Sequence, residues 1–176
     1  MIIDETERLI IKEIDAEDYG RAAFFFSVIN TKNTTIDEET EYDEKFVTDY
    51  CEAAYGFYGY GYYGIYLKNG EFIGLAGFRE GSCPLDVGFI IDEKYRGKGY
   101  AGEAVKSLTE WAYEDFLWVV NEEEKMTPTE VAGRHPEMLT LVKECNGAVL
   151  LYAVTGKENY SAQKVLLHND YELIEL

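Results

Sequence analysis

The chain has 176 residues, of which 47% are hydrophobic, and this length and composition predict one folded domain spanning residues 1–176. Three prolines and the absence of a low-complexity tract exclude a disordered protein. A formal net charge of −18 excludes a nucleic-acid backbone as the main partner, because that partner requires a basic surface, and it favours cationic partners instead.

The first third of the chain predicts a strand and two helices. Apolar and polar residues partly alternate over 7–14, which indicates a strand, and Asp15 is expected to cap a helix that follows it. A second helix is expected from Asp37, where eight carboxylates and one base lie between Asp37 and Glu52. We interpret this acidic concentration mainly as a solvated helix face, with attraction of a cationic substrate as the alternative.

The middle of the chain predicts three strands in succession. An aromatic and glycine-rich run over 55–63 is expected to be a loop that enters the first of them. Asn69 and Gly70 stand between two apolar segments, 64–67 and 71–76, and an Asn-Gly pair in that position is a strong signal of a two-residue hairpin. The third strand is expected over 85–91.

A glycine-rich turn follows directly after this third strand. Residues 95–102 read Tyr-Arg-Gly-Lys-Gly-Tyr-Ala-Gly, and a helical pattern begins at Glu103. At such a junction small residues let a ligand approach the backbone, and the unpaired amides of the first helical turn favour an anion. The spacing matches neither the lysine phosphate loop nor the dinucleotide fingerprint. The turn therefore predicts a phosphate site, with a tight strand-to-helix connection as the alternative.

The last third of the chain continues with helices and strands. After the helix that ends near Phe116, we expect a short helix from Thr127 and another helix over 136–145, ended by Asn146 and Gly147. The remaining predicted elements are a buried strand over 148–155, a helix over 159–169 and a final strand over 171–176. This order predicts an α+β fold with a mixed sheet.

Four segments resemble the RimJ/RimL-type branch of the GNAT superfamily of acyl-CoA N-acyltransferases. They are the opening strand and helix (6–18), the third strand (74–78), the acetyl-CoA motif (87–104) and a closing motif that runs from Ala153 through Asn159 to Tyr171. The resemblance implies a GNAT-type sheet, mixed but mostly antiparallel, flanked by helices in three layers. It also marks about 117–147 as an inserted helical segment, where the branch has a short link.

The chain departs from this branch at three places. Ala162 stands where the family usually has Ser, and Asp170 stands where a glycine usually ends the last helix. The sequence also stops at Leu176, where the family usually adds a further long strand. We therefore expect an unpaired sheet edge near the acceptor site, unless a second subunit, as in a homodimer, or the insertion covers it.

The resemblance implies an N-acetyltransferase that moves an acetyl group from acetyl-CoA to a primary amine by direct attack. The acceptor is expected to be a small cationic amine or the amino terminus of a peptide or protein. A catalytically degenerate protein that binds an acyl-CoA as a sensor or interaction module is the alternative, and a structural domain without a CoA site is a third possibility. The predicted CoA contacts are Ile90, Ile91, Arg96, Gly97, Lys98, Gly99, Tyr100, Ala101, Gly102, Asn159 and Lys164.

Within this set, Arg96, Lys98 and Lys164 are expected to neutralise phosphates, and Asn159 to bond the pantetheine amide. Lys98 has an alternative role as an exposed turn lysine. The thioester carbonyl is expected to be held by a backbone amide of the strand that ends at Ile91.

The amine can attack only as the neutral base, so a base or a desolvating site must help it lose its proton. Asp86 is the first candidate, because alternation places it on one face with Gly88, and Glu80 is the second. Solvated strand-end carboxylates are the alternative for both. Because Asp is shorter than Glu, we expect transfer through a water.

The acid that protonates the leaving thiolate has no obvious candidate. Leu166 stands where many superfamily members have a Tyr. Tyr160, Tyr171 or water are the possible substitutes. Alternatively no acid is needed, because the thiolate of a thiol with a pKa of about 8.5 is an adequate leaving group.

Cysteine and histidine usage gives no sign of a metal. The cysteines are Cys51, Cys83 and Cys145, which are odd in number and widely spaced, so reduced thiols are expected; the chain has two histidines. The amino terminus lacks a basic start with an apolar signal core, and no apolar run is long enough to span a membrane. We expect a cytoplasmic protein without a membrane partner.

Overall fold

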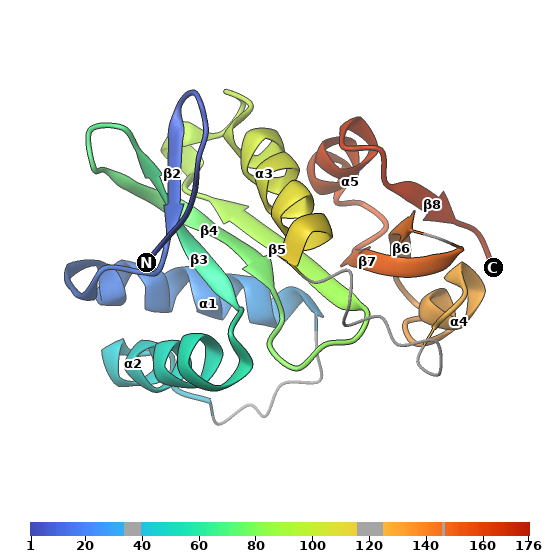
Figure 1. Cartoon of the computed structure of the whole chain (residues 1–176), viewed down its shortest axis with the longest axis horizontal. Helices are drawn as coiled ribbons and strands as arrows, with labels where there is room; N and C mark the ends of the chain where they lie inside the picture. The colour runs from blue at the N-terminus through green and yellow to red at the C-terminus, as the bar shows by residue number, and fades with distance from the viewer. Residues whose placement is uncertain (34–39, 116–124, 146) are drawn as a thin grey trace.

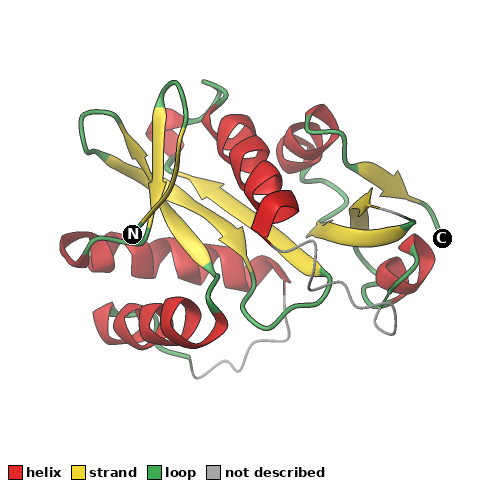
Figure 2. Cartoon of the chain, in the orientation of Figure 1, coloured by secondary structure: helices red, strands yellow, loops and turns green. Residues whose placement is uncertain are grey.

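An eight-stranded sheet organises the chain (Figures 1 and 2). The computed structural model describes residues 1–33, 40–115, 125–145 and 147–176. The strands are β1 (Ile2–Glu5), β2 (Leu9–Lys12), β3 (Tyr62–Leu67), β4 (Phe72–Phe78), β5 (Leu85–Ile91), β6 (Leu139–Cys145), β7 (Ala148–Thr155) and β8 (Glu172–Ile174). Their order across the sheet is β1-β2-β3-β4-β5-β7-β6-β8, and β5 with β7 is the single parallel pair among the described strands. The mixed, mostly antiparallel sheet of an α+β fold is confirmed.

Helices cover both faces of this sheet and produce three layers. They are α1 (Tyr19–Asn33), α2 (Glu44–Ala53), α3 (Tyr100–Asp115), α4 (Pro128–Gly133) and α5 (Tyr160–His168), with the short turns η1 (Ala16–Asp18), η2 (Ala54–Tyr58) and η3 (Glu93–Tyr95). Helices α1 and α2 lie against one face, while α3 and α5 lie side by side over the other (Figure 1). Among the described residues, no helix combines the length and the apolar character needed to cross a membrane.

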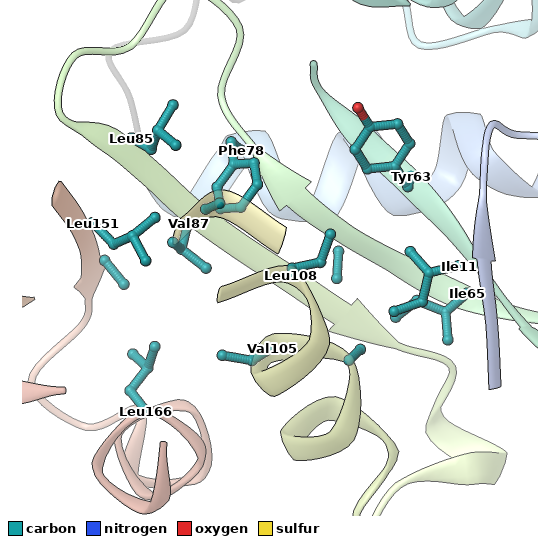
Figure 3. Packing of buried hydrophobic residues seen from close by; sticks show 14 of the residues in the cluster. Ile11, Tyr63, Ile65, Phe78, Leu85, Val87, Val105, Leu108, Leu151 and Leu166 are labelled. Carbon is teal, nitrogen blue, oxygen red and sulfur yellow. The ribbon is translucent and has the colours of Figure 1, made fainter. Parts of the chain in front are cut away.

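The central strands bury both faces, so their sequences are continuously apolar rather than alternating. Tyr62 packs towards α1 and α2, whereas its neighbour Tyr63 packs on the α3 side. On that second side Val105 and Leu108 of α3 lie over the strands, and Leu166 of α5 points towards the same apolar layer (Figure 3). Burial of this apolar surface fixes α3 and α5 relative to β5 and β7.

The amino-terminal region agrees with the prediction in its elements but not in its details. The predicted strand is β2, and β1 precedes it without having been predicted. Asp15 begins the helical region at η1, yet its side chain makes no capping hydrogen bond and instead pairs with Lys12 Nζ at 2.5 Å. The second helix begins at Glu44 rather than at Asp37, because Asp43 caps it by accepting from Phe46 N at 2.8 Å. Residues 37–39 lie outside the described residues.

The predicted helix over 136–145 is wrong, because most of this segment forms strand β6. Leu141 packs on the α3 side of the sheet and Val142 on the α4 side, so a short apolar run is buried on both faces. Periodicity alone cannot separate such a run from a buried helix. Of the Asn-Gly pair that predicted a helix end, Asn146 lies outside the described residues, and Gly147 has a φ of +80° directly before β7. The short helix after Thr127 is confirmed as α4, which opens with a capping box.

Strand β6 also changes the expectation of an unpaired edge. It lies between β7 and β8 and pairs antiparallel with both, so that Val142 faces Tyr152 on one side and Glu172 on the other. The insertion therefore contributes a strand to the sheet as well as a helix, and it covers the side of β7 that faces away from β5.

Candidate functional site

The two parallel strands β5 and β7 separate along their length. They pair at Leu85 with Leu151 and at Asp86 with Tyr152, at the start of β5. Strand β5 stays paired with β4 on its other side as far as Ile91. Every second residue of β5 turns its N–H and C=O away from β4, so beyond Asp86 these groups face the gap between β5 and β7.

Two cavities occupy this gap and the surface beside it. The first has a volume of about 340 Å³ and is lined from both sides of the sheet, by Ile29 of α1 and by Leu166 of α5. The second has a volume of about 610 Å³ and lies over the glycine turn and the start of α5. Both are lined by Phe89, Ile90 and Asn159, so together they form a cleft that crosses the sheet.

The glycine turn forms one wall of the larger cavity. Gly97 and Gly99 have φ angles of +77° and +83°, which favour glycine, and the Gly99 carbonyl accepts from Glu103 N at 3.1 Å. The first amides of α3 have no partner within the helix, and Ala101 and Gly102 of this first turn line the cavity. Free amides and the positive end of a helix dipole favour an anion, which agrees with the predicted phosphate site.

Ten of the eleven predicted CoA contacts line this larger cavity, and the exception is Lys98. Its ammonium lies 5.4 Å from the centre of the Tyr95 ring, and its backbone carbonyl accepts from Arg8 Nη1 at 2.8 Å. Lys98 thus fits the alternative of an exposed turn lysine better than the role of a phosphate ligand. Arg96 is exposed at the cavity, where its Nε donates to the Ile91 carbonyl at 2.9 Å.

Helix α5 brings further groups to the cleft. Asn159 caps the helix by accepting from Ala162 N at 3.3 Å, and it lines both cavities. Lys164 lines the larger cavity as expected, and His168 does so without having been predicted. A helix repeat of three to four residues places 161, 164, 165 and 168 on one face, so the helical pattern was the signal that could have identified His168.

Asp86 lies at the opposite end of the cleft, where β5 and β7 still pair. Its side chain is 4% exposed, and Arg79 Nε lies 3.2 Å from its Oδ2. Burial raises the pKa of Asp86 to about 6, and the Arg79 charge offsets part of that rise. Asp86 itself does not line either cavity, but the next residues, Val87 and Gly88, line the first. A water-mediated contact with the cleft is consistent with this placement.

Tyr62 is a neighbour of Asp86 that sequence reasoning missed. A Cβ at Gly88 would lie 2.4 Å from the Tyr62 hydroxyl, so this hydroxyl lies over Gly88 on the face that Asp86 shares. Burial raises the pKa of Tyr62 well above its usual range, with the Asp86 charge adding to the effect, so the phenol stays protonated and can donate. A glycine in an otherwise bulky strand was the signal that another side chain occupies its space.

Glu80, the second candidate base, lies just beyond the end of β4. Burial raises its pKa, and a hydrogen bond from the Tyr50 hydroxyl offsets part of that rise. The same hydroxyl accepts from Tyr62 N at 2.7 Å. Two carboxyl groups with raised pKa values, Asp86 and Glu80, therefore lie near Tyr62 at this end of the cleft.

The predicted acid candidates do not reach the cleft. Tyr160 is 70% exposed and lines neither cavity, and we withdraw it as a candidate acid. Tyr171 is buried, with its hydroxyl 3.0 Å from Thr109 Oγ1. Leu166, at the position where many GNAT proteins have a Tyr, lines the first cavity.

The acidic helix α2 does not line the cleft either. Its carboxylates Glu44, Asp49 and Glu52 are exposed, and Asp49 pairs with Lys45 at 2.5 Å. The helical wall of the first cavity on that face comes from α1. For the described part of this region, a solvated helix face is therefore the better interpretation.

One acidic group in the described part of the chain has the spacing of metal ligands, with atoms of Asp15, Glu17 and Asp18 within 4.8 Å of one another. It lies at the start of the α1 region, where Lys12 already pairs with Asp15. None of the three lines the cleft. This group is an ordinary surface feature, and we assign no metal to it.

Comparison with known proteins identifies related sequences and folds. The family model of the acetyltransferase (GNAT) domain matches residues 8–172. No curated protein matches the chain.

Solved structures match over nearly the whole chain at low identity. An acetyltransferase from Agrobacterium tumefaciens is 21% identical with a TM-score of 0.58, covering 94% of this chain and 81% of that one. RimL, a ribosomal L7/L12 alpha-N-protein acetyltransferase in complex with CoA, is 13% identical with a TM-score of 0.58, covering 96% and 82%. A ribosomal-protein-S5-alanine acetyltransferase from Vibrio fischeri is 16% identical with a TM-score of 0.58, covering 94% and 80%. At these identities the likeness shows the fold.

Proposed function

The chain belongs to the acetyltransferase (GNAT) domain family, and from this premise we propose that it transfers an acetyl group from acetyl-CoA to a primary amine. The observation that carries the proposal is the cleft across the sheet. It has the glycine turn and the α3 amides at one end and opens between β5 and β7 next to Asp86 at the other. A phosphate site at one end of a cleft and a carboxyl group with a raised pKa next to its other end support acyl transfer from CoA, since the first binds the donor and the second can act as a base.

In this proposal the larger cavity holds the phosphate end of the donor. The amides of the first turn of α3 bind the pyrophosphate, and Arg96 and Lys164 supply positive charge. Asn159 bonds the pantetheine arm, and β5 amides that face the gap between the strands hold the thioester carbonyl. Such fixed donors stabilise the negative charge that develops on this oxygen, and no covalent intermediate with the protein is needed.

Asp86 is the proposed base that takes a proton from the acceptor amine through a water. A pKa of about 6 leaves Asp86 mostly ionised at pH 7 and brings its basicity closer to that of the amine than an ordinary carboxylate would be. The Tyr62 hydroxyl lies on the same face and can hold that water. Glu80 is the second candidate, because burial raises its pKa as well.

For the acceptor we propose the amino terminus of a peptide or protein. Two of the structural neighbours are named as acetyltransferases of ribosomal proteins, one of them as an alpha-N-protein acetyltransferase. The net charge of −18 favours a cationic acceptor over the whole surface, whether a basic protein or a small polyamine-like base. A homodimer and a cytoplasmic location remain part of the proposal.

The experiment separates CoA binding from catalysis. Thermal stability and calorimetry with acetyl-CoA come first; a ligand present at about 100 times its dissociation constant adds roughly 2.7 kcal/mol of stability. Release of free thiol is then measured with acetyl-CoA and a panel of basic peptides with free amino termini, amino-terminally blocked controls and polyamines. Turnover of the free peptides but not of the blocked ones is the expected result.

The matched variants are Ala101→Glu and Ala101→Gln, which add side chains of similar size to the cavity wall. The carboxylate of the first repels phosphates, so we expect it to weaken CoA binding at least about tenfold more than the neutral amide does. Binding without turnover of any amine would indicate the sensor alternative. Absence of acetyl-CoA binding to the wild-type protein would refute the proposed function.

A further inference from the structure

Arg8, which lies in the turn before β2, contacts the glycine turn. Its Nη1 donates to the Lys98 carbonyl at 2.8 Å, and its guanidinium lies 4.6 Å from the centre of the Tyr100 ring. A Cβ at Gly99 would lie 3.4 Å from Arg8 Nη2, so the guanidinium packs directly against this glycine. Neither cavity is lined by Arg8.

The contact with the Lys98 carbonyl sets the direction of the next amide. A trans peptide unit is planar, and its C=O and N–H point to opposite sides. The hydrogen bond turns the Lys98 carbonyl towards Arg8, so the N–H of Gly99 points the other way, and Gly99 lines the larger cavity. Gly97 and Gly99, on either side of Lys98, have positive φ angles and could otherwise adopt many conformations.

A second group of contacts fixes Arg8 itself. Its Nε donates to Glu103 Oε2 at 2.7 Å, while Thr6 Oγ1 donates to Glu103 Oε1 at 2.5 Å. Burial alone would raise the pKa of Glu103, but the hydrogen bonds from Thr6 and Arg8 outweigh it and lower the pKa. Glu103 stays ionised, so the guanidinium is held in two directions, by Glu103 of α3 and by the Lys98 carbonyl.

We propose that Arg8 is a positioning residue for the pyrophosphate of acetyl-CoA, because it holds the Lys98 peptide in the orientation that aims the Gly99 amide at the ligand. The inference rests on the proposed function and adds a residue more than 80 positions away from the turn that it orients. A lysine at this position cannot replace it fully, since a single ammonium lacks the planar fork that reaches a carboxylate and a carbonyl together.

The test measures CoA affinity by calorimetry in Arg8→Ala, Arg8→Lys and the control Lys68→Ala. Lys68, in the hairpin between β3 and β4, forms an exposed ion pair with Glu5 Oε2 at 3.1 Å, and it lines neither cavity. We expect the dissociation constant of CoA to rise about tenfold in Arg8→Ala, the size of one lost charge-assisted hydrogen bond, and less in Arg8→Lys. Lys68→Ala is expected to bind as the wild type does.

A shortened donor distinguishes positioning from general damage. Acetyl-pantetheine lacks the pyrophosphate, so Arg8→Ala should lower kcat/KM with acetyl-CoA while leaving kcat/KM with acetyl-pantetheine within about twofold of the wild type. Equal losses with both donors, or unchanged CoA affinity, would overturn the inference while the proposed function stands. Failure of the wild type to bind CoA overturns both, and binding without turnover leaves the calorimetric test decisive for Arg8.

Discussion

The two ends of the cleft are built in different ways. At the donor end, the wall that would bind phosphate is one contiguous segment, 95–102, which connects the end of η3 to the start of α3, and α5 adds further residues to it. The Asp86 end is assembled from residues far apart in sequence: Tyr62 from β3, Arg79 after β4, Asp86 in β5 and Tyr152 in β7. Local sequence therefore determines the glycine turn of the first end, whereas tertiary packing determines the whole of the second.

The insertion belongs to the second end. His135, just after α4, stacks on Tyr152 with ring centres 6.4 Å apart, and Tyr152 pairs in register with Asp86. Arg134 Nη1 donates to the Cys83 carbonyl at 3.3 Å, at the turn that leads into β5. The surroundings of Asp86 therefore depend on how the described part of the insertion packs, whereas no described residue of the insertion lines the cavity over the glycine turn. We expect donor binding and acceptor chemistry to respond separately to substitution.

The largest expected effect is on catalysis in Asp86→Asn. Loss of a general base lowers kcat by about 10²- to 10⁴-fold, while CoA affinity stays close to that of the wild type, because Asp86 is at the other end of the cleft. The raised pKa means that burial disfavours the charged carboxylate, and Arg79 is about one-third exposed, so it tolerates loss of its partner. The urea midpoint at pH 8 should therefore be no lower than that of the wild type.

Glu80→Gln is the matched control for this substitution, since it also replaces a partly buried carboxylate by an amide. We expect a smaller loss of kcat than in Asp86→Asn. A larger loss in Glu80→Gln would transfer the base assignment to Glu80. Loss of CoA binding in either variant would show that the two ends of the cleft are not independent.

The next largest effect is expected in Gly88→Ala. The added methyl group would lie 2.4 Å from the Tyr62 hydroxyl and 2.8 Å from its ring, in a strand that is buried on both faces. Overpacking of this kind costs about 1–3 kcal/mol of unfolding free energy, which urea denaturation measures. Because the clash involves Tyr62, the double variant Gly88→Ala with Tyr62→Phe should recover part of that loss. An unchanged stability of Gly88→Ala would show that Tyr62 does not occupy the space over Gly88.

The same difference between local and tertiary determination explains what the sequence could predict. The Asn69-Gly70 hairpin, the strand over 148–155 and the helix opened by Asn159 follow from short signals, and the structure contains all three. Residue Asp170 ends the last helix with a φ of +62°, so an Asp adopts the conformation for which the family usually has glycine.

What the sequence could not predict depends on partners that lie far away along the chain. Strand β6 is a strand because β7 and β8 flank it, and its own apolar run is equally compatible with a helix. The raised pKa of Asp86 and the position of Tyr62 over Gly88 follow from packing between strands. The support of the glycine turn by Arg8 spans 90 residues, although the turn itself was recognisable.

A smaller effect is expected in the pH dependence. Between the ordinary value of 3.8 and about 6, folded Asp86 binds a proton that the unfolded chain has released, so its contribution to stability falls as pH rises through this range and is constant above it. As a base, Asp86 must be ionised. We therefore expect kcat/KM of the wild type, divided by kcat/KM of Asp86→Asn, to be constant above pH 6 and to fall about tenfold for each pH unit by which the pH is lowered below 6. Titration of the amine cancels in this ratio. A ratio that is flat from pH 5 to pH 8 would contradict a role for Asp86 as the base.

The smallest effect is expected at Tyr160, where Tyr160→Phe should change kcat by less than about twofold in a rate assay of thiol release. Its hydroxyl is on the exposed side of α5, whereas Ala162 and Leu166 of the same helix line the cleft. A loss of tenfold or more, with unchanged CoA affinity, would require α5 to turn this face towards the thioester during the reaction. In that case the acceptor end would be completed by movement of α5, and the separation between a locally determined glycine turn and a packed acceptor end would no longer hold.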